Sequence, residues 1–475
     1  MSNRVPRALV HGLGLALGAV AMGYLAATLE EGLLGFALGL FWSLAIAAVL
    51  SHRSTMHFGG EPWWRVVVIA GLLIRVPIVF VHIVIGYLVY GGQQDFAAYH
   101  YWGVDLVVKL LRGNFEFFEI PYLDPSQGGA AVVTRFLAVA TFVFGPGLTG
   151  LFIMSGIVGF MGSYLFVRAF QAAFPGTPEI RRVALMMFFF PSLAFWTSLL
   201  GKDSWTMLFL GMSTYAGARM LATPRPRYLL GFFASLALVA TIRPPVGLAI
   251  VVAASAVLLM TVRRHMVSGP AAVLRPVVWA ACAMVIVVAV AVVAEPIRKY
   301  EQAFSADTPL TEGMLNLAVH KGAGLSTDPN ASGSSIHHNI QPGVVGYLKF
   351  LPQGMFAFMF RPLVFEAHNI LALAASLEGT TLLVITLWRL PSLLRALRLT
   401  LRDPFVTYCV MVLLTVTAGL APESNFGVVV RHRAMVLPFF FMLMTIPRER
   451  MRAVERVPAS ARVGPTAAMP VRTRP

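Results

Sequence analysis

The chain has 475 residues, of which 57% are hydrophobic and 12% are charged, and its mean hydropathy is +0.75. A soluble chain carries about 25% charged residues, so this composition excludes an ordinary soluble protein. The formal net charge is +16. Because the basic residues cluster in short segments between apolar runs, they indicate membrane topology rather than a nucleic-acid partner.

Apolar runs of about 18–25 residues recur from end to end, each long enough to cross a hydrocarbon core of about 30 Å. Backbone groups in lipid must be hydrogen-bonded within their own segment, so the sequence predicts an all-α, polytopic transmembrane bundle of about twelve spans. A signal peptide is the alternative interpretation of the first run. The predicted spans are 9–27, 33–50, 66–90, 148–170, 184–200, 204–222, 227–242, 244–262, 277–295, 367–390, 404–421 and 432–447.

The spans and the loops between them divide the chain into five parts. Two long polar segments separate the groups of spans, and the Pro/Ala/Arg-rich end predicts a disordered tail. The parts are 1–65 with two spans, 66–295 as a transmembrane core that includes a first outer loop at 91–147, 296–366 as a second outer loop, 367–447 with the C-terminal spans, and 448–475 as a basic tail.

The arginines between spans set the predicted orientation. If both termini are cytoplasmic, every loop on that side holds arginine, including 171–183 and 263–276, as the positive-inside rule requires. We therefore expect a multi-pass protein of the cell (inner) membrane, with the loops 91–147 and 296–366 outside the cytoplasm. In the first of these loops, residues 101–113 place valines and a leucine on one helical face. This pattern predicts a short amphipathic helix at the membrane surface.

Charged residues also stand at the predicted outer ends of spans, where the positive-inside rule disfavours basic side chains. Each one alone is explained by a solvated turn or a local ion pair. Together they predict a site for a phosphate or diphosphate, for which arginine has the fitting bidentate geometry. A lipid-linked phosphate is the ligand at that depth. The residues are Lys202 and Asp203 in one tight turn, Arg243 in another, Glu366 before a span, and Arg431 and Arg433 in a third turn.

Arg75 lies inside the third predicted span, with His82 two turns further along. A charge at that position is costly and usually faces the interior of the bundle. We interpret Arg75 as a structural ion-pair partner, with a role on a lipid-phosphate path as the alternative.

Several short motifs follow one another between residues 66 and 262: "LLIRVPIVF", "QQDFAAYHYWG", "FPSLAFWTSLLGKDSWTMLFLG" and "ATIRPPVG". With them the chain resembles the GT-C superfamily of integral-membrane glycosyltransferases. The resemblance implies an enzyme that moves a sugar from a polyprenyl-phosphate-linked donor to an acceptor at the extracytoplasmic face, in cell-surface polysaccharide assembly. It also makes residues 66–295 a GT-C-like core.

In this resemblance Asp95 matches the catalytic acid of the first outer loop, where a carboxylate acts as general base on the acceptor hydroxyl. Tyr99 and His100 follow one helical turn later and are predicted to seat the acceptor. The leaving phosphate would be stabilised by Lys202, Arg243 and Arg431 or Arg433.

The chain departs from the superfamily pattern in one respect. Many members carry a second acid next to the first or two residues away, whereas Asp95 is flanked by Gln94 and Phe96. Asp105, Asp124 and Glu366 remain open as the missing carboxylate, and a divalent cation, Mg²⁺ or Mn²⁺, remains open as a cofactor.

Two other functions compete with this expectation. A Wzy-type polysaccharide polymerase or an O-antigen ligase also uses lipid-diphosphate glycans at the outer face. A lipid or solute transporter predicts polar residues and broken helices at the midplane and an internal repeat, which the sequence does not display. The expected partners are a polyprenyl-phosphate- or diphosphate-linked glycan, membrane lipids and other polysaccharide-assembly proteins, without nucleic acid.

Overall fold

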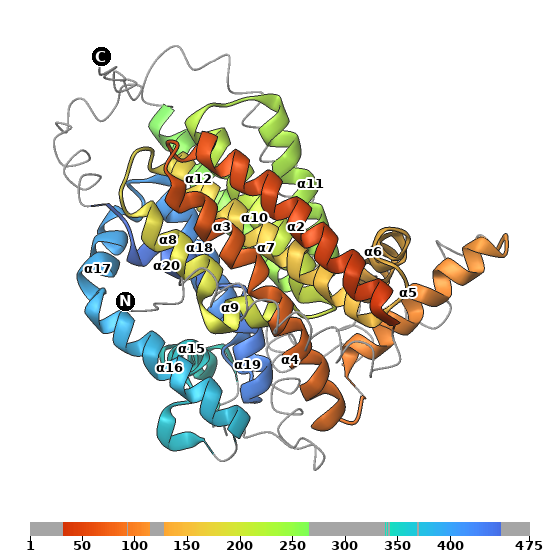
Figure 1. Ribbon diagram of the computed structural model, residues 1–475. Coiled ribbons are helices and arrows are strands. Elements are labelled where there is room, and N and C mark those ends of the chain that lie inside the picture. The colour runs from red at the N-terminus through yellow and green to blue at the C-terminus, as the bar shows by residue number, and fades with distance from the viewer. Residues whose placement is uncertain are drawn as a thin grey trace, which may run out of the picture.

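The computed structural model describes residues 32–92, 94–114, 128–265, 338, 340, 343–367 and 370–447. Within these ranges every regular element is a helix, so the predicted all-α class is confirmed there (Figure 1). The helices are α2 (Gly32–His57), α3 (Pro62–Leu73), α4 (Arg75–Leu88), α5 (Asp95–Leu111), α6 (Gly128–Phe144), α7 (Leu148–Ala173), α8 (Ile180–Phe189), α9 (Pro191–Trp196), α10 (Lys202–Ala222), α11 (Pro226–Ile242), α12 (Pro244–His265), α15 (Gly343–Phe360), the 3₁₀ turn η4 (Val364–Glu366), α16 (Ile370–Trp388), α17 (Leu390–Leu399), α18 (Pro404–Leu420), α19 (Phe426–Arg433) and α20 (Leu437–Met444).

Four helical stretches in the described part of the chain are long and apolar enough to cross a membrane: Leu33–His57, Pro62–Leu88, Leu148–Ala173 and Pro244–Thr261. Two further pairs meet the same test together but are bent, α17 with α18 by 111° and α19 with α20 by 56°. The described helices therefore supply four to six candidate spans. They agree with a membrane protein, but they do not establish the predicted number of twelve.

Some of the predicted segments lie outside the described residues. These are the spans 9–27 and 277–295, most of the second loop 296–366, and the tail 448–475.

Helix α7 is the centre of the bundle, and α10 packs along it (Figure 1). Two glycines allow their backbones to touch. A Cβ atom on Gly211 would lie 2.5 Å from the carbonyl oxygen of Gly162, and a Cβ atom on Gly162 would lie 2.4 Å from that of Met207. Small residues at a crossing of membrane helices permit this close approach. The contact fixes α10, and with it the first residues of α10, against the core.

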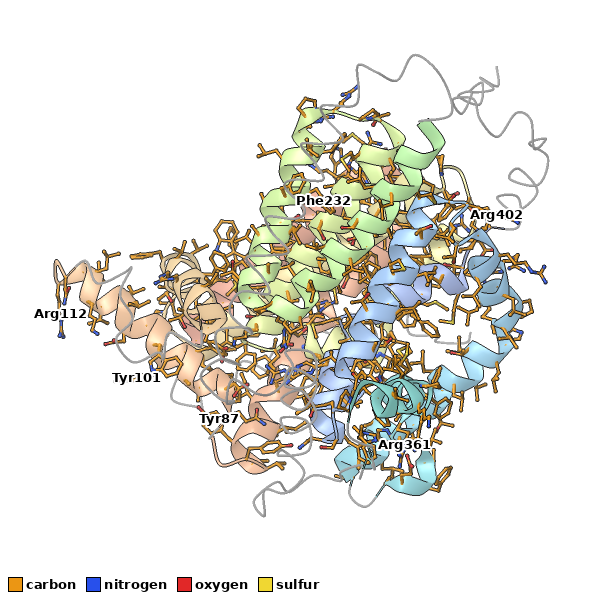
Figure 2. All side chains as sticks on the ribbon, turned by 180° about the vertical axis from the view of Figure 1, so that it is seen from behind. Tyr87, Tyr101, Arg112, Phe232, Arg361 and Arg402 are labelled. Atoms are coloured by element: carbon orange, nitrogen blue, oxygen red, sulfur yellow. The ribbon has the colours of Figure 1, made fainter. Side chains whose placement is uncertain are left out.

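Helices α5 and α6 form an arm at the side of the bundle, and α5 reaches away from it with Arg112 at the far end (Figure 2). The first turns of α5 face the core, where Phe96 and Tyr99 are buried. Further along, Tyr101 and Leu111 are exposed. A helix is thus present in the predicted segment, and its inner end touches the bundle beside the start of α10. Its position at a membrane surface stays a prediction.

Candidate functional site

Four charged side chains from distant parts of the sequence meet at the first turn of α10. Asp203 Oδ1 accepts a hydrogen bond from Arg243 Nη2 at 2.5 Å, and Asp203 Oδ2 accepts one from Arg431 Nε at 2.7 Å. Arg431 Nη1 in turn donates to Asp95 Oδ2 at 3.1 Å. We call Asp95, Asp203, Arg243 and Arg431 the aspartate–arginine cluster.

Local sequence explains how each arginine reaches the cluster. Arg243 is the last residue before Pro244, which begins α12, so the α11–α12 turn is tight and holds Arg243 at the end of the bundle. Arg431 follows the start of α19, where the Asn425 side chain accepts from the backbone N–H groups of Gly427 and Val428. This cap fixes the beginning of α19 and the direction in which its next turns point.

Asp95 is the first residue of α5, and Gln94 is its N-cap. Aspartate is a favoured helix cap, so capping of α5 is a purely structural role that Asp95 could have. In the structure the Asp95 carboxylate instead bonds to Arg431 on another element. A negative charge at this first turn is also favoured by the helix dipole. The position of Asp95 therefore depends on α19 as well as on α5.

Exposure changes steadily across the cluster. The side chain of Asp203 is 4% exposed, those of Arg243 and Arg431 are 15% and 21% exposed, and that of Asp95 is 66% exposed. A buried carboxylate is costly unless it is paired, and two guanidinium groups pair with Asp203. Asp203 is thus an internal anchor, whereas Asp95 and one edge of the arginines are open to a ligand.

Three neighbours surround the cluster. Arg243 Nη1 lies 2.9 Å from His432 Nε2, and because a guanidinium donates, this nitrogen accepts and the imidazole is neutral. Burial lowers the pKa of the Lys202 ammonium, as does the charge of Arg243, while Asp95 opposes both effects. Burial and the charge of Asp95 raise the pKa of the Tyr99 hydroxyl, and the Tyr99 ring lies against Gly201.

Sequence reasoning missed His432. The sequence places His432 between Arg431 and Arg433. This position alone does not predict which of the two arginines His432 contacts.

Arg433 and Glu366 were predicted for the site, and the structure places both elsewhere. Arg433 has no exposed side-chain surface; its Nη2 lies 3.4 Å from Glu378 Oε1, and its Nη1 donates to the carbonyl oxygens of Met359 and Arg361. Glu366 forms an ion pair with Arg361 and accepts from the Leu363 N–H at 2.8 Å. Arg433 fastens the end of α15 to α19, whereas Glu366 bonds within the short segment between α15 and α16.

The remaining candidates also have separate partners. His100 Nε2 lies 2.7 Å from the Pro146 carbonyl oxygen and joins α5 to the α6–α7 turn. Asp105 pairs with Lys109 one turn further along α5, at 3.1 Å. Asp124 lies outside the described residues. Asp203 is thus the second carboxylate that the structure brings near Asp95, although sequence reasoning had placed it with the phosphate-binding residues.

Arg75 is buried at the break between α3 and α4. Its Nη1 donates to Thr197 Oγ1 at 2.5 Å and Ser198 Oγ at 3.3 Å, and its Nη2 donates to Ser163 Oγ at 3.3 Å. The predicted interior position is correct, but the partners shown for this guanidinium are hydroxyls and the Ala194 carbonyl rather than an acid. Arg75 ties α4 to the short helix α9.

A metal centre stays a prediction. Among the residues that the structure describes, no three histidine, cysteine, aspartate or glutamate side chains gather closely enough to hold a metal ion. The aspartate–arginine cluster can bind an anion through its arginines and accept a proton at Asp95.

Comparison of the chain with protein-family models, curated proteins and solved structures finds no match.

Proposed function

We propose that the protein is a membrane glycosyltransferase that moves a sugar from a polyprenyl-phosphate-linked donor to an acceptor at the extracytoplasmic face, in the assembly of a cell-surface polysaccharide. The observation that carries the proposal is the pairing of an exposed carboxylate, Asp95, with Arg431, whose guanidinium is held from behind by the buried Asp203. The GT-C resemblance, the arrangement of about twelve spans and the cytoplasmic position of both termini belong to the same proposal.

The arginines supply the binding of the donor phosphate. Arg243 and Arg431 share one buried anchor, so their guanidinium groups are held in place before a ligand arrives. When the sugar leaves, negative charge accumulates on the polyprenyl phosphate, and donors that are already oriented stabilise it without reorganisation. Lys202, in the same turn as Asp203, adds a third cation.

Asp95 is the proposed general base. It takes the proton of the acceptor hydroxyl while the acceptor oxygen bonds to the anomeric carbon, and the bond from that carbon to the phosphate oxygen breaks with its electron pair. A phosphate that arrives at the cluster competes with Asp95 for Arg431.

The test is transfer by the purified full chain in liposomes that contain a panel of labelled polyprenyl-phosphate sugars and a candidate lipid-linked acceptor. Formation of a new lipid-linked glycan supports the proposal. Mass spectrometry of lipid-linked glycans in a deletion strain tests the polymerase alternative, because accumulation of one unpolymerised repeat unit favours a polymerase over a single-sugar transferase. Normal glycans in the deletion strain and no transfer from any donor contradict the proposal.

Transport is the second candidate function, and one observation favours it. The helix break at Arg75 lies against a second break, the end of α9 at Trp196, where Arg75 donates to the Thr197 and Ser198 hydroxyls. Discontinuous helices with polar groups between them are typical of transporter binding sites. Movement of a fluorescent lipid across liposome membranes that contain the protein, lost in Arg75→Gln, would replace the transferase proposal.

A further inference from the structure

A cavity of about 440 Å³ lies at the other end of the bundle from the aspartate–arginine cluster. Its lining includes Glu179, which precedes α8, and Arg389, which follows α16. From Glu179 the chain crosses the bundle through α8 and α9 before it reaches Asp203 in α10. The cavity and the cluster are therefore separate sites.

The cavity carries an excess of positive charge. Arg182, Arg389 and Arg395 line it together with one acid, Glu179. Arg182 Nη1 lies 2.6 Å from Glu179 Oε2, and Arg389 Nη2 lies 3.6 Å from the same oxygen, so a single carboxylate serves two guanidinium groups. A concave surface with three arginines favours an anion, and planar guanidinium groups match the oxygens of a phosphate.

Helix α17 indicates the depth in the membrane at which the cavity opens. It is bent by 111° from α18 and buries the face of Ser392, Ala396 and Leu399 against the bundle. Its opposite face presents an apolar row, as an amphipathic helix does when it lies in the interface of a membrane. The exposed residues of the row are Leu390, Leu394 and Leu397.

The exposure of Trp388 indicates the same depth, at the membrane interface. It lines the cavity, yet 77% of it is exposed. Tryptophan side chains concentrate where acyl chains meet lipid headgroups. A membrane whose headgroups meet Trp388 would place Arg395 and Ser392, on the inner side of α17, beside lipid phosphates and the leucines among the first carbons of the acyl chains.

We infer that this cavity binds the phosphate of an anionic phospholipid from the adjacent leaflet, which the arginine distribution predicts to be the cytoplasmic one. Arg389 and Arg395 hold the phosphate oxygens, Arg182 lies at the exposed rim, and Trp388 packs beside the glycerol and upper acyl chain. The inference does not depend on the proposed transferase activity. It assigns a lipid ligand to the end of the molecule opposite the proposed reaction.

The test counts phosphatidylglycerol molecules that remain on the full-length protein in detergent, with phosphatidylcholine as the neutral lipid. Arg395→Gln and Arg389→Gln each remove one charge-assisted contact, and we expect about a tenfold loss of phosphatidylglycerol affinity. The matched control is Arg398→Gln, which removes the same charge from an exposed position on α17 outside the cavity lining. General surface attraction accounts for at most about fivefold in that control.

Each outcome either supports or overturns the inference. Selective loss in the cavity variants supports the inference, and retention of phosphatidylglycerol by Arg395→Lys strengthens it. An equal loss in Arg398→Gln overturns it in favour of diffuse attraction, and binding of phosphatidylcholine as tightly as phosphatidylglycerol also overturns it. Displacement of the lipid by inorganic phosphate at the same concentration would show a site for free phosphate instead. If Arg389→Gln fails to fold, Arg395→Gln alone supplies the comparison with Arg398→Gln.

Discussion

Arg431 and Arg433 lie two residues apart on α19, and their surroundings are opposite. Arg431 bridges Asp203 and Asp95 and remains partly exposed, whereas Arg433 is fully buried against Glu378 and two backbone carbonyls. Two residues turn a helix by about 200°, so the two side chains leave it on different sides. One short basic motif therefore provides both a partly exposed cation and a buried structural cation. The difference shows that function follows the direction of a side chain and not only its type.

The largest expected effect concerns Asp95, the exposed partner of Arg431. Asp95→Asn keeps the size of the side chain and one acceptor oxygen but removes the base, so we expect transfer to fall by about 10²–10⁴-fold with the protein still folded. The measurement is the initial rate of sugar transfer in liposomes. The control is Asp105→Asn on the same helix, whose carboxylate pairs with Lys109, and its rate should stay near that of the native protein. A fully active Asp95→Asn protein would remove Asp95 from the mechanism.

On the structural side, Arg433→Met should leave Glu378 buried without its cation and cost about 3–5 kcal/mol of stability. The midpoint of thermal unfolding in detergent should fall strongly, while the activity of each folded molecule stays unchanged. Replacing Glu378 with methionine as well removes the unpaired charge, so the double variant should recover most of the loss. If the double variant is as unstable as the single one, the ion pair is not what holds this region.

Arg431→Lys tests the difference between Arg431 and Arg433 more closely. It keeps the positive charge but removes the guanidinium group that bridges Asp203 and Asp95. We expect about a tenfold rise in the donor-lipid concentration needed for half-maximal rate. The unfolding midpoint should change little, since Asp203 keeps Arg243. A fall in stability as large as that of Arg433→Met would show that the two arginines differ less than their surroundings suggest.

The smallest expected effect concerns Lys202. Its lowered pKa means that its ammonium group loses the proton at a lower pH than the ordinary 10.5, so binding of the donor phosphate should weaken as pH rises through that lowered value. In Lys202→Arg, the fall in transfer rate at alkaline pH (the alkaline limb of the pH profile) should move to higher pH. Lys202→Met should abolish this limb and lower the rate at neutral pH about fivefold. The measurement is the pH profile of transfer. An identical alkaline limb in all three proteins would assign it to another group.

The sequence predicts much of the fold because its signals are local. Apolar runs and prolines mark where helices begin and end, as at Pro244, and they place Lys202, Asp203 and Arg243 in tight turns. The break at Pro191 was not predicted, because it lies inside one apolar run that was assigned to a single span, 184–200. The site was harder to predict, since Arg431 and Asp95 are separated by 336 positions along the chain. Local pattern also cannot separate Arg431 from Arg433. Their roles depend on which neighbour each side of α19 meets.

The contact of α7 with α10 has a consequence for movement. At Gly162 and Gly211 the two backbones leave no room even for a methyl group, so neither helix can slide or rotate past the other without separating. Asp203, at the start of α10, is therefore a stationary point. Arg431 stands on a segment bent by 56°, and Asp95 stands at the base of an arm. If the molecule opens and closes around a substrate, these two residues move and Asp203 is the pivot.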